Sequence, residues 1–168
     1  MIDLANGMGG YFSFLGDSQA KITIVPGDAR ISLERELTKS GPANFDVLAL
    51  DVFSSDSVPV HLVTKEAFAI YLQHLAPDGI IAANISNRNL DLVPVLWNLA
   101  NYYHLEMALI PDDAGSPRAF PSSWVLMTRD PALLQKPEIA ARCVSMAGYA
   151  AKILLWTDDF SNLFQILK

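Results

Sequence analysis

Short apolar runs alternate with amphipathic stretches along this chain. The runs at 21–25, 45–50, 79–85, 105–110 and 124–128 are rich in β-branched or aliphatic residues. Each has the length of a strand, and Gly, Pro, Asp or Ser residues bound most of them. The pattern therefore predicts five strands at these positions.

Helical spacing of apolar residues separates the first four of these runs. It predicts helices over 31–37, from Thr64 to about residue 75, and from Asn89 or Asp91 to Tyr103. Thr64 has the character of an N-cap, and Pro94 suits the first turn of its helix. Residues 131–150 are predicted to be irregularly helical. A final helix is expected near the C-terminus, capped by Asp158 or Asp159, with Phe160, Leu163, Phe164 and Leu167 as a core stripe.

The order of these elements favours an α/β fold. Strands that alternate with helices predict a Rossmann-like, mostly parallel sheet with helices on both faces. No helix separates the last two strands, so we expect an antiparallel strand at the edge. Length and the lack of repeats or linkers predict a single domain over 1–168.

Composition narrows the class of protein. Hydrophobic residues make up 51% and charged residues 18% of the sequence, which argues against disorder. No apolar run approaches the roughly 18–20 residues of a membrane span. There is no pattern of a signal peptide, and the one cysteine, Cys143, suits a reducing cytoplasm. The net charge is −6 and the 12 basic residues are scattered, so nucleic-acid binding is not expected.

Two acids follow predicted strands at positions where open α/β sheets bind ligands. Asp28 follows the run at 21–25, and Asp51 follows the run at 45–50. Asp28 also suits the N-cap of the next helix, and a cap and a ligand contact are compatible. An acid directly after a buried strand is costly unless it is hydrogen-bonded or functional, so Asp51 favours a site.

Several stretches resemble the spermidine synthase (polyamine aminopropyltransferase) family. They are Gly27-Asp28-Ala29-Arg30, the strand 45–50 with Asp51, Ser54-Ser55-Asp56, residues 62–68 and the segment 156–163. The resemblance runs from about residue 11 to the C-terminus. The resemblance rests on the combination of these stretches, because no single stretch is specific to the family.

The resemblance implies the fold of class I S-adenosylmethionine-dependent methyltransferases and a set of roles. Asp28 and Ala29 would contact the adenosyl ligand, and Asp51 would accept a proton from the attacking amine. Asp56, with Ser54 and Ser55, would bind the small-molecule amine or polyamine. The donor or product would be decarboxylated S-adenosylmethionine, S-adenosylmethionine or methylthioadenosine, with no cofactor bound tightly.

The sequence also departs from this family. The family's first strand and its glycine-rich loop have no counterpart, and Met1 stands near the position of the acid that binds the ribose. Gly7, Gly9 and Gly10 lack the G-x-G-x-x-G spacing. Three interpretations stay open: a transferase, a non-catalytic domain with weak nucleoside binding or a role in assembly, and a fragment of a longer enzyme.

The missing strand also bears on assembly. The segment 21–25 can pair directly with the strand 45–50, or that strand keeps an open edge that recruits another chain. We expect direct pairing with residual exposed apolar surface, and hence a homodimer. His61, His74 and His104 have no metal-like spacing, so we expect them to be structural and expect no metal site.

Overall fold

Among the described residues the sheet has four strands, which lie in the order β1-β2-β4-β3. The computed structural model describes residues 2–51, 59–112, 121–144, 146 and 148–168. Within these residues the strands are β1 (Phe45–Leu50), β2 (Leu75–Asn84), β3 (Glu106–Asp112) and β4 (Ser122–Thr128). The strand at 45–50 has the predicted bounds.

Strand direction confirms the α/β class. β1 pairs parallel with β2, and β4 pairs antiparallel with both β2 and β3. The edge strand β3 thus makes an antiparallel pair, as expected. β1, β2 and β3 share one direction, and the reversed strand β4 lies one position in from that edge.

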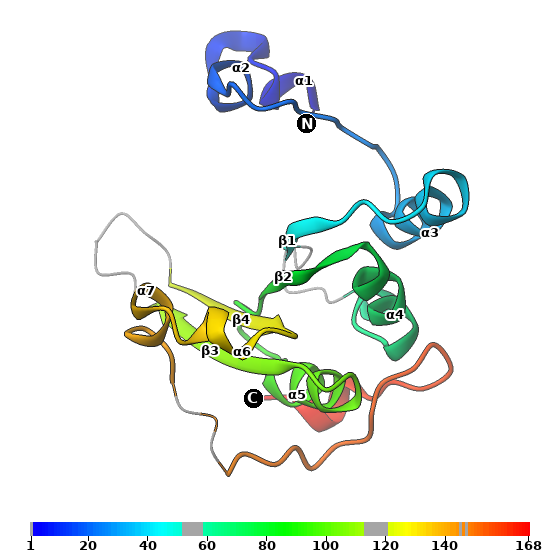
Figure 1. Cartoon of the computed structure of the whole chain (residues 1–168), viewed down its shortest axis with the longest axis vertical. Helices are drawn as coiled ribbons and strands as arrows, with labels where there is room; N and C mark the ends of the chain where they lie inside the picture. Colours follow the sequence, from blue (N-terminus) through cyan, green and yellow to red (C-terminus); the bar gives the residue numbers. More distant parts are fainter. Residues whose placement is uncertain (1, 52–58, 113–120, 145, 147) are drawn as a thin grey trace.

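In the part of the chain that the structure describes, three helices of ten or more residues accompany the sheet (Figure 1). They are α3 (Ala29–Ser40), α4 (Lys65–His74) and α5 (Val93–Tyr102). The Thr64 side chain accepts a hydrogen bond from the Ala67 N–H and caps α4, and Pro94 lies in the first turn of α5. The remaining helical segments are short: α1 (Ile2–Ala5), η1 (Met8–Gly10), α2 (Phe14–Asp17), η2 (Val60–Leu62), α6 (Pro131–Leu134), α7 (Pro137–Ala140) and η3 (Leu163–Ile166).

The core lies between one face of the sheet and helices α4 and α5. Its fully buried members include Ile81 and Ala83 of β2 and Val125 and Met127 of β4. The tail residue Trp156 joins them. The opposite face of β1 is much less covered, as the 60% exposure of Val47 shows.

The prediction of a strand at 21–25 is wrong. These residues form no strand, and Ile22, Ile24 and Val25 are 43%, 42% and 66% exposed. A β-branched run becomes a strand only when a partner supplies hydrogen bonds, and among the described residues β1 pairs with β2 alone. Direct pairing of 21–25 with β1 is therefore also wrong, and β1 keeps an open edge.

Two further differences concern β2 and the C-terminal tail. β2 begins at Leu75, earlier than the expected residue 79, and runs through Pro77, Asp78 and Gly79. A Cβ at Gly79 would lie 2.6 Å from the carbonyl oxygen of Phe45, so the glycine permits this close approach of β1 and β2. The core stripe expected in the tail is wrong, because Phe164 is 85% exposed and Ile166 is buried instead. A four-residue 3-10 turn does not follow the α-helical period.

The N-terminal helices α1 and α2 lie away from the sheet (Figure 1). The apolar residues Leu4, Met8, Tyr11, Phe12 and Phe14 of this segment are all exposed. Within the described residues, no helix is both long and apolar enough to cross a membrane.

Candidate functional site

Two polar side chains meet where the parallel strands β1 and β2 end. Asp51 directly follows β1, and Asn84 is the last residue of β2. The Asn84 Nδ2 donates a hydrogen bond of 2.8 Å to Oδ1 of Asp51. The Asn84 Oδ1 accepts a hydrogen bond of 2.9 Å from the backbone N–H of Ser86, which fixes the orientation of the amide.

The position of Asp51 is the one expected from the sequence, whereas Asn84 was missed. Neighbouring parallel strands end at the same rim of a sheet. A polar residue near the end of each predicted strand could therefore have indicated Asn84 as well as Asp51. Asp51 is exposed, and its Oδ2 has no hydrogen bond to the described residues. A carboxylate oriented in this way can accept a proton from an amine or hold an ammonium group.

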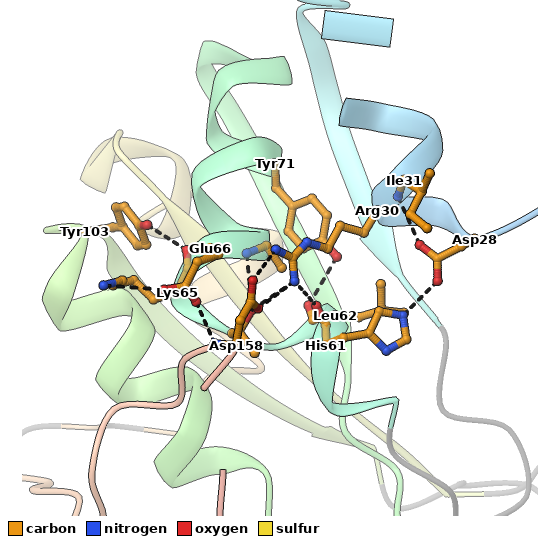
Figure 2. A network of polar contacts seen from close by, with 12 residues as sticks. Asp28, Arg30, Ile31, His61, Leu62, Lys65, Glu66, Tyr71, Tyr103 and Asp158 are labelled. Carbon is orange, nitrogen blue, oxygen red and sulfur yellow. Dashed lines mark hydrogen bonds and ion pairs between the residues drawn. The ribbon is translucent and has the colours of Figure 1, made fainter. Parts of the chain in front are cut away.

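Asp28 caps α3, as expected, and also contacts a histidine. One carboxylate oxygen accepts a hydrogen bond of 3.0 Å from the Ile31 N–H, and the other lies 2.7 Å from Nε2 of His61 (Figure 2). The Ile31 N–H, and next the His61 side chain, lower the pKa of Asp28. Ala29 is the first residue of α3 and is exposed. Both Asp28 oxygens have protein partners, and the contact of Asp28 and Ala29 with an adenosyl ligand stays a prediction.

A polar network joins the start of α3, the start of α4 and the tail (Figure 2). The Arg30 guanidinium donates two hydrogen bonds to the Asp158 carboxylate, at 2.7 and 2.6 Å, and a third of 3.0 Å to the carbonyl of His61. The Thr64 hydroxyl donates to Asp158 at 2.8 Å, and the Asp158 N–H donates to Glu66 at 2.9 Å. The expectation that Asp158 caps the final helix is wrong, because the side chain bonds to a residue 128 positions earlier.

The charge of this network acts on Asp158. The hydrogen bond from Arg30 is the main reason that the pKa of Asp158 lies below its usual value. The sequence offered no local signal for the pair, because Arg30 and Asp158 are far apart along the chain. The network therefore holds the tail against the starts of α3 and α4, close to Asp28.

His61 contacts Asp28, whereas His74 lies in the core. His74 is fully buried, its Nδ1 accepts a hydrogen bond from the Ala43 N–H, and its Nε2 donates one to the Leu33 carbonyl. It is structural, as expected. In the part of the chain that the structure describes, no three His, Cys, Asp or Glu side chains are grouped as metal ligands would be.

The expected acceptor-binding residues Ser54, Ser55 and Asp56 lie outside the described residues. Their roles, and the pairing of Asp56 with Asp51 as a second carboxylate, stay predictions.

Comparisons with known proteins identify similar structures. No protein-family model matches the sequence, and no curated protein matches it. Among solved structures, a probable spermidine synthase from Corynebacterium glutamicum is 25% identical, covers 66% of this chain and has a TM-score of 0.49. This chain is similar to spermidine synthases.

Two further spermidine synthases match over most of the chain. The enzyme from Thermotoga maritima is 17% identical over 94% of this chain, with a TM-score of 0.49. A spermidine synthase in complex with the transition state analogue AdoDATO is 16% identical over 94%, with a TM-score of 0.48. This chain spans 39% of the first structure and 50% of each of the other two.

Proposed function

We propose that this chain is part of a transferase of the spermidine synthase type. It moves an aminopropyl or methyl group from an adenosyl sulfonium donor to a small amine. The donors we expect are decarboxylated S-adenosylmethionine or S-adenosylmethionine. The sequence resemblance supports the reaction class, and the hydrogen bond between Asn84 and Asp51 at the sheet rim is the observation that carries the role of Asp51.

The reaction requires a base beside the acceptor amine. The amine nitrogen attacks the carbon attached to the sulfonium, so an N–C bond forms as the C–S bond breaks. The bonding electrons neutralise the sulfur, and the nitrogen must lose a proton, which the Asp51 carboxylate accepts. Asn84 acts as a positioning residue, because its amide holds one oxygen of that carboxylate.

The test is turnover by an Asp51 variant against a matched control. We expect Asp51→Asn to lower kcat by about 10²–10⁴-fold, the usual contribution of a positioned general base. Asp46→Asn is the control, because Asp46 is an exposed acid on β1, the strand that Asp51 follows. Release of the thioether nucleoside product from each donor, with putrescine or spermidine as acceptor, measures the rate. Equal turnover of the two variants would remove Asp51 from the mechanism.

A second candidate is a non-catalytic domain that binds a nucleoside weakly or serves in assembly. The observation that favours it is the engagement of both Asp28 oxygens, by Ile31 and His61. An adenine amino group would have to share or replace one of these partners. Turnover separates the two candidates, because a non-catalytic domain releases no thioether nucleoside product from either donor. Calorimetric titration with both donors and methylthioadenosine measures how tightly the chain binds each of these nucleosides. The fragment interpretation, the cytoplasmic location and the single domain stay predictions.

A further inference from the structure

β1 is an open edge of the sheet. Among the described residues it pairs with β2 alone, so the backbone N–H and C=O groups along its other side have no partner strand there. Val47 of β1 is 60% exposed, and Ala49, two positions later, is also exposed. The two side chains point to the same face, because side chains alternate along a strand. The edge therefore presents unused hydrogen-bonding groups beside an apolar strip.

The segment 21–25 is a run of strand-forming residues without a partner strand. Its backbone makes no hydrogen bond to the described residues, and it runs as an extended trace between α2 and α3 (Figure 1). Ile22, Ile24 and Val25 are 43%, 42% and 66% exposed. β-branched residues are most favourable where a neighbouring strand packs against them. The segment is therefore suited to join a sheet and is accessible for doing so.

The start of α3 holds the base of this segment. Pro26 and Gly27 connect the segment to Asp28, whose carboxylate accepts a hydrogen bond from the Ile31 N–H and lies 2.7 Å from His61. Gly27 has a φ of 130°, a conformation that favours glycine, so the chain turns directly before the cap. With its base held in this way, the segment does not pair with its own β1 and is accessible to a second molecule.

The two strands match in one parallel register. In this register Ile22 lies beside Val47, and Ile24 lies beside Ala49. The side chains at these four positions then share one face of the sheet, and all four are exposed in the single chain. Pairing of this kind buries apolar side chains on both strands and supplies the missing backbone hydrogen bonds.

Charge selects the parallel direction. In the parallel register Lys21 lies beside Asp46, and both side chains are exposed. Cross-strand pairs of opposite charge are favourable. The antiparallel register with the same face exposed places Lys21 beside Leu50, which is only 5% exposed. It also places Val25 beside Asp46. Parallel pairing avoids both mismatches, because Val25 then lies beside Leu50.

The residues before the segment supply further apolar surface. Leu4, Met8, Tyr11, Phe12 and Phe14 are between 38% and 77% exposed. A stable interface takes about 20–30 residues from each partner, and residues 2–25 form a segment of that size. The N-terminal segment is therefore long enough and apolar enough to hold two copies together.

We propose that two copies of this chain exchange their N-terminal segments, residues 2–25. The segment 21–25 of each copy adds a parallel strand to the β1 edge of the other. Reciprocal exchange about a two-fold axis covers both open edges, so the assembly closes as a dimer. The added strand ends at the same rim of the sheet as Asp51, so the exchanged segment borders the candidate site. The exchange does not depend on the proposed transfer function.

Disulfide cross-linking between two different variants tests the exchange. Ile22→Cys and Val47→Cys are each made in a Cys143→Ser chain, refolded together and oxidised. Paired residues of neighbouring strands lie about 5 Å apart, within the range that a disulfide spans. We expect a disulfide-linked dimer as the main product of the mixture, and none from the Val47→Cys chain alone. Both positions are exposed in the single chain, and thermal midpoints verify that the variants fold.

Sedimentation equilibrium measures the contribution of the segment to association. Val25→Lys places a charge beside Leu50 of the partner subunit and should raise the dimer dissociation constant by at least about tenfold. Leu154→Lys is the control, because Leu154 is 64% exposed, close to the 66% of Val25, and lies outside the exchanged segment. We expect Leu154→Lys to associate like the wild type.

Four outcomes would overturn the proposal. A wild-type monomer at micromolar concentration excludes the dimer, and equal dissociation constants of the two lysine variants exclude a role for Val25. A cross-link in the Val47→Cys chain alone indicates direct pairing of two β1 edges. A monomeric cross-link in a chain that carries both cysteines indicates pairing within one molecule. None of these measurements involves turnover, so failure of the exchange and failure of the transfer function are distinguishable.

Discussion

The contact between Arg30 and Asp158 gives the sharpest test of how this chain is held together. The guanidinium makes two short hydrogen bonds to the carboxylate and connects the start of α3 to the tail. Asp158→Asn removes the negative charge and keeps the size of the side chain. We expect it to lower the free energy of unfolding.

The magnitude follows from the exposure of the two groups. Hydrogen bonds to charged groups contribute about 1.5–3 kcal/mol each when they are shielded from water. Here the side chains of Arg30 and Asp158 are 17% and 39% exposed. Solvent screening reduces the contribution of such a pair, so we expect a loss of about 1–2 kcal/mol for both bonds together. For a chain of this size that corresponds to a decrease in Tm of about 2–8 °C.

Denaturant unfolding and thermal melting measure the effect. Asp159→Asn is the matched control, because Asp159 is the exposed neighbouring acid. A double-mutant cycle with Arg30→Gln isolates the pair, and we expect a coupling of about 1 kcal/mol. A coupling near zero, together with equal stabilities of the two Asp variants, would refute the reasoning.

The pair should also give stability a defined dependence on pH. The folded-state pKa of Asp158 is lowered, chiefly by Arg30, so the carboxylate stabilises the fold above its unfolded pKa of about 3.9. That contribution is lost as the pH falls through the folded value. The difference between wild type and Asp158→Asn should therefore be constant near neutral pH and decrease as the pH falls from about 4 through the lower folded pKa. A difference that persists unchanged at pH 2–3 would contradict this assignment.

Three other predictions concern packing, assembly and ligand binding. Gly79→Ala should destabilise the fold by about 1–3 kcal/mol, because its Cβ would approach the Phe45 carbonyl, whereas Gly16→Ala meets open space and should have little effect in chemical denaturation. The open edge of β1 predicts a homodimer in sedimentation at micromolar concentration, and a monomer would contradict it. Adenosyl ligands should bind with dissociation constants above about 100 μM in calorimetry, and micromolar binding would contradict this.

Local signals in the sequence predicted the elements that depend on near neighbours. The strand 45–50, the Thr64 cap, the Asp28 cap and the place of Pro94 all appear as expected. Each depends on residues within one turn of helix or on the length of one apolar run. Asp51 was also singled out as a candidate, because an acid that directly follows an apolar run is conspicuous without knowledge of the fold.

The tertiary structure decided everything that depends on distant partners. The segment 21–25 has strand-forming residues but no partner strand, and β2 extends through Gly79 because β1 approaches there. Asn84 meets Asp51 only through the register of two parallel strands, and Asp158 meets Arg30 across 128 positions. Residue propensity and periodicity contain no information about such pairings. Strand register and the path of the chain set the pairings, and the candidate site is built from them.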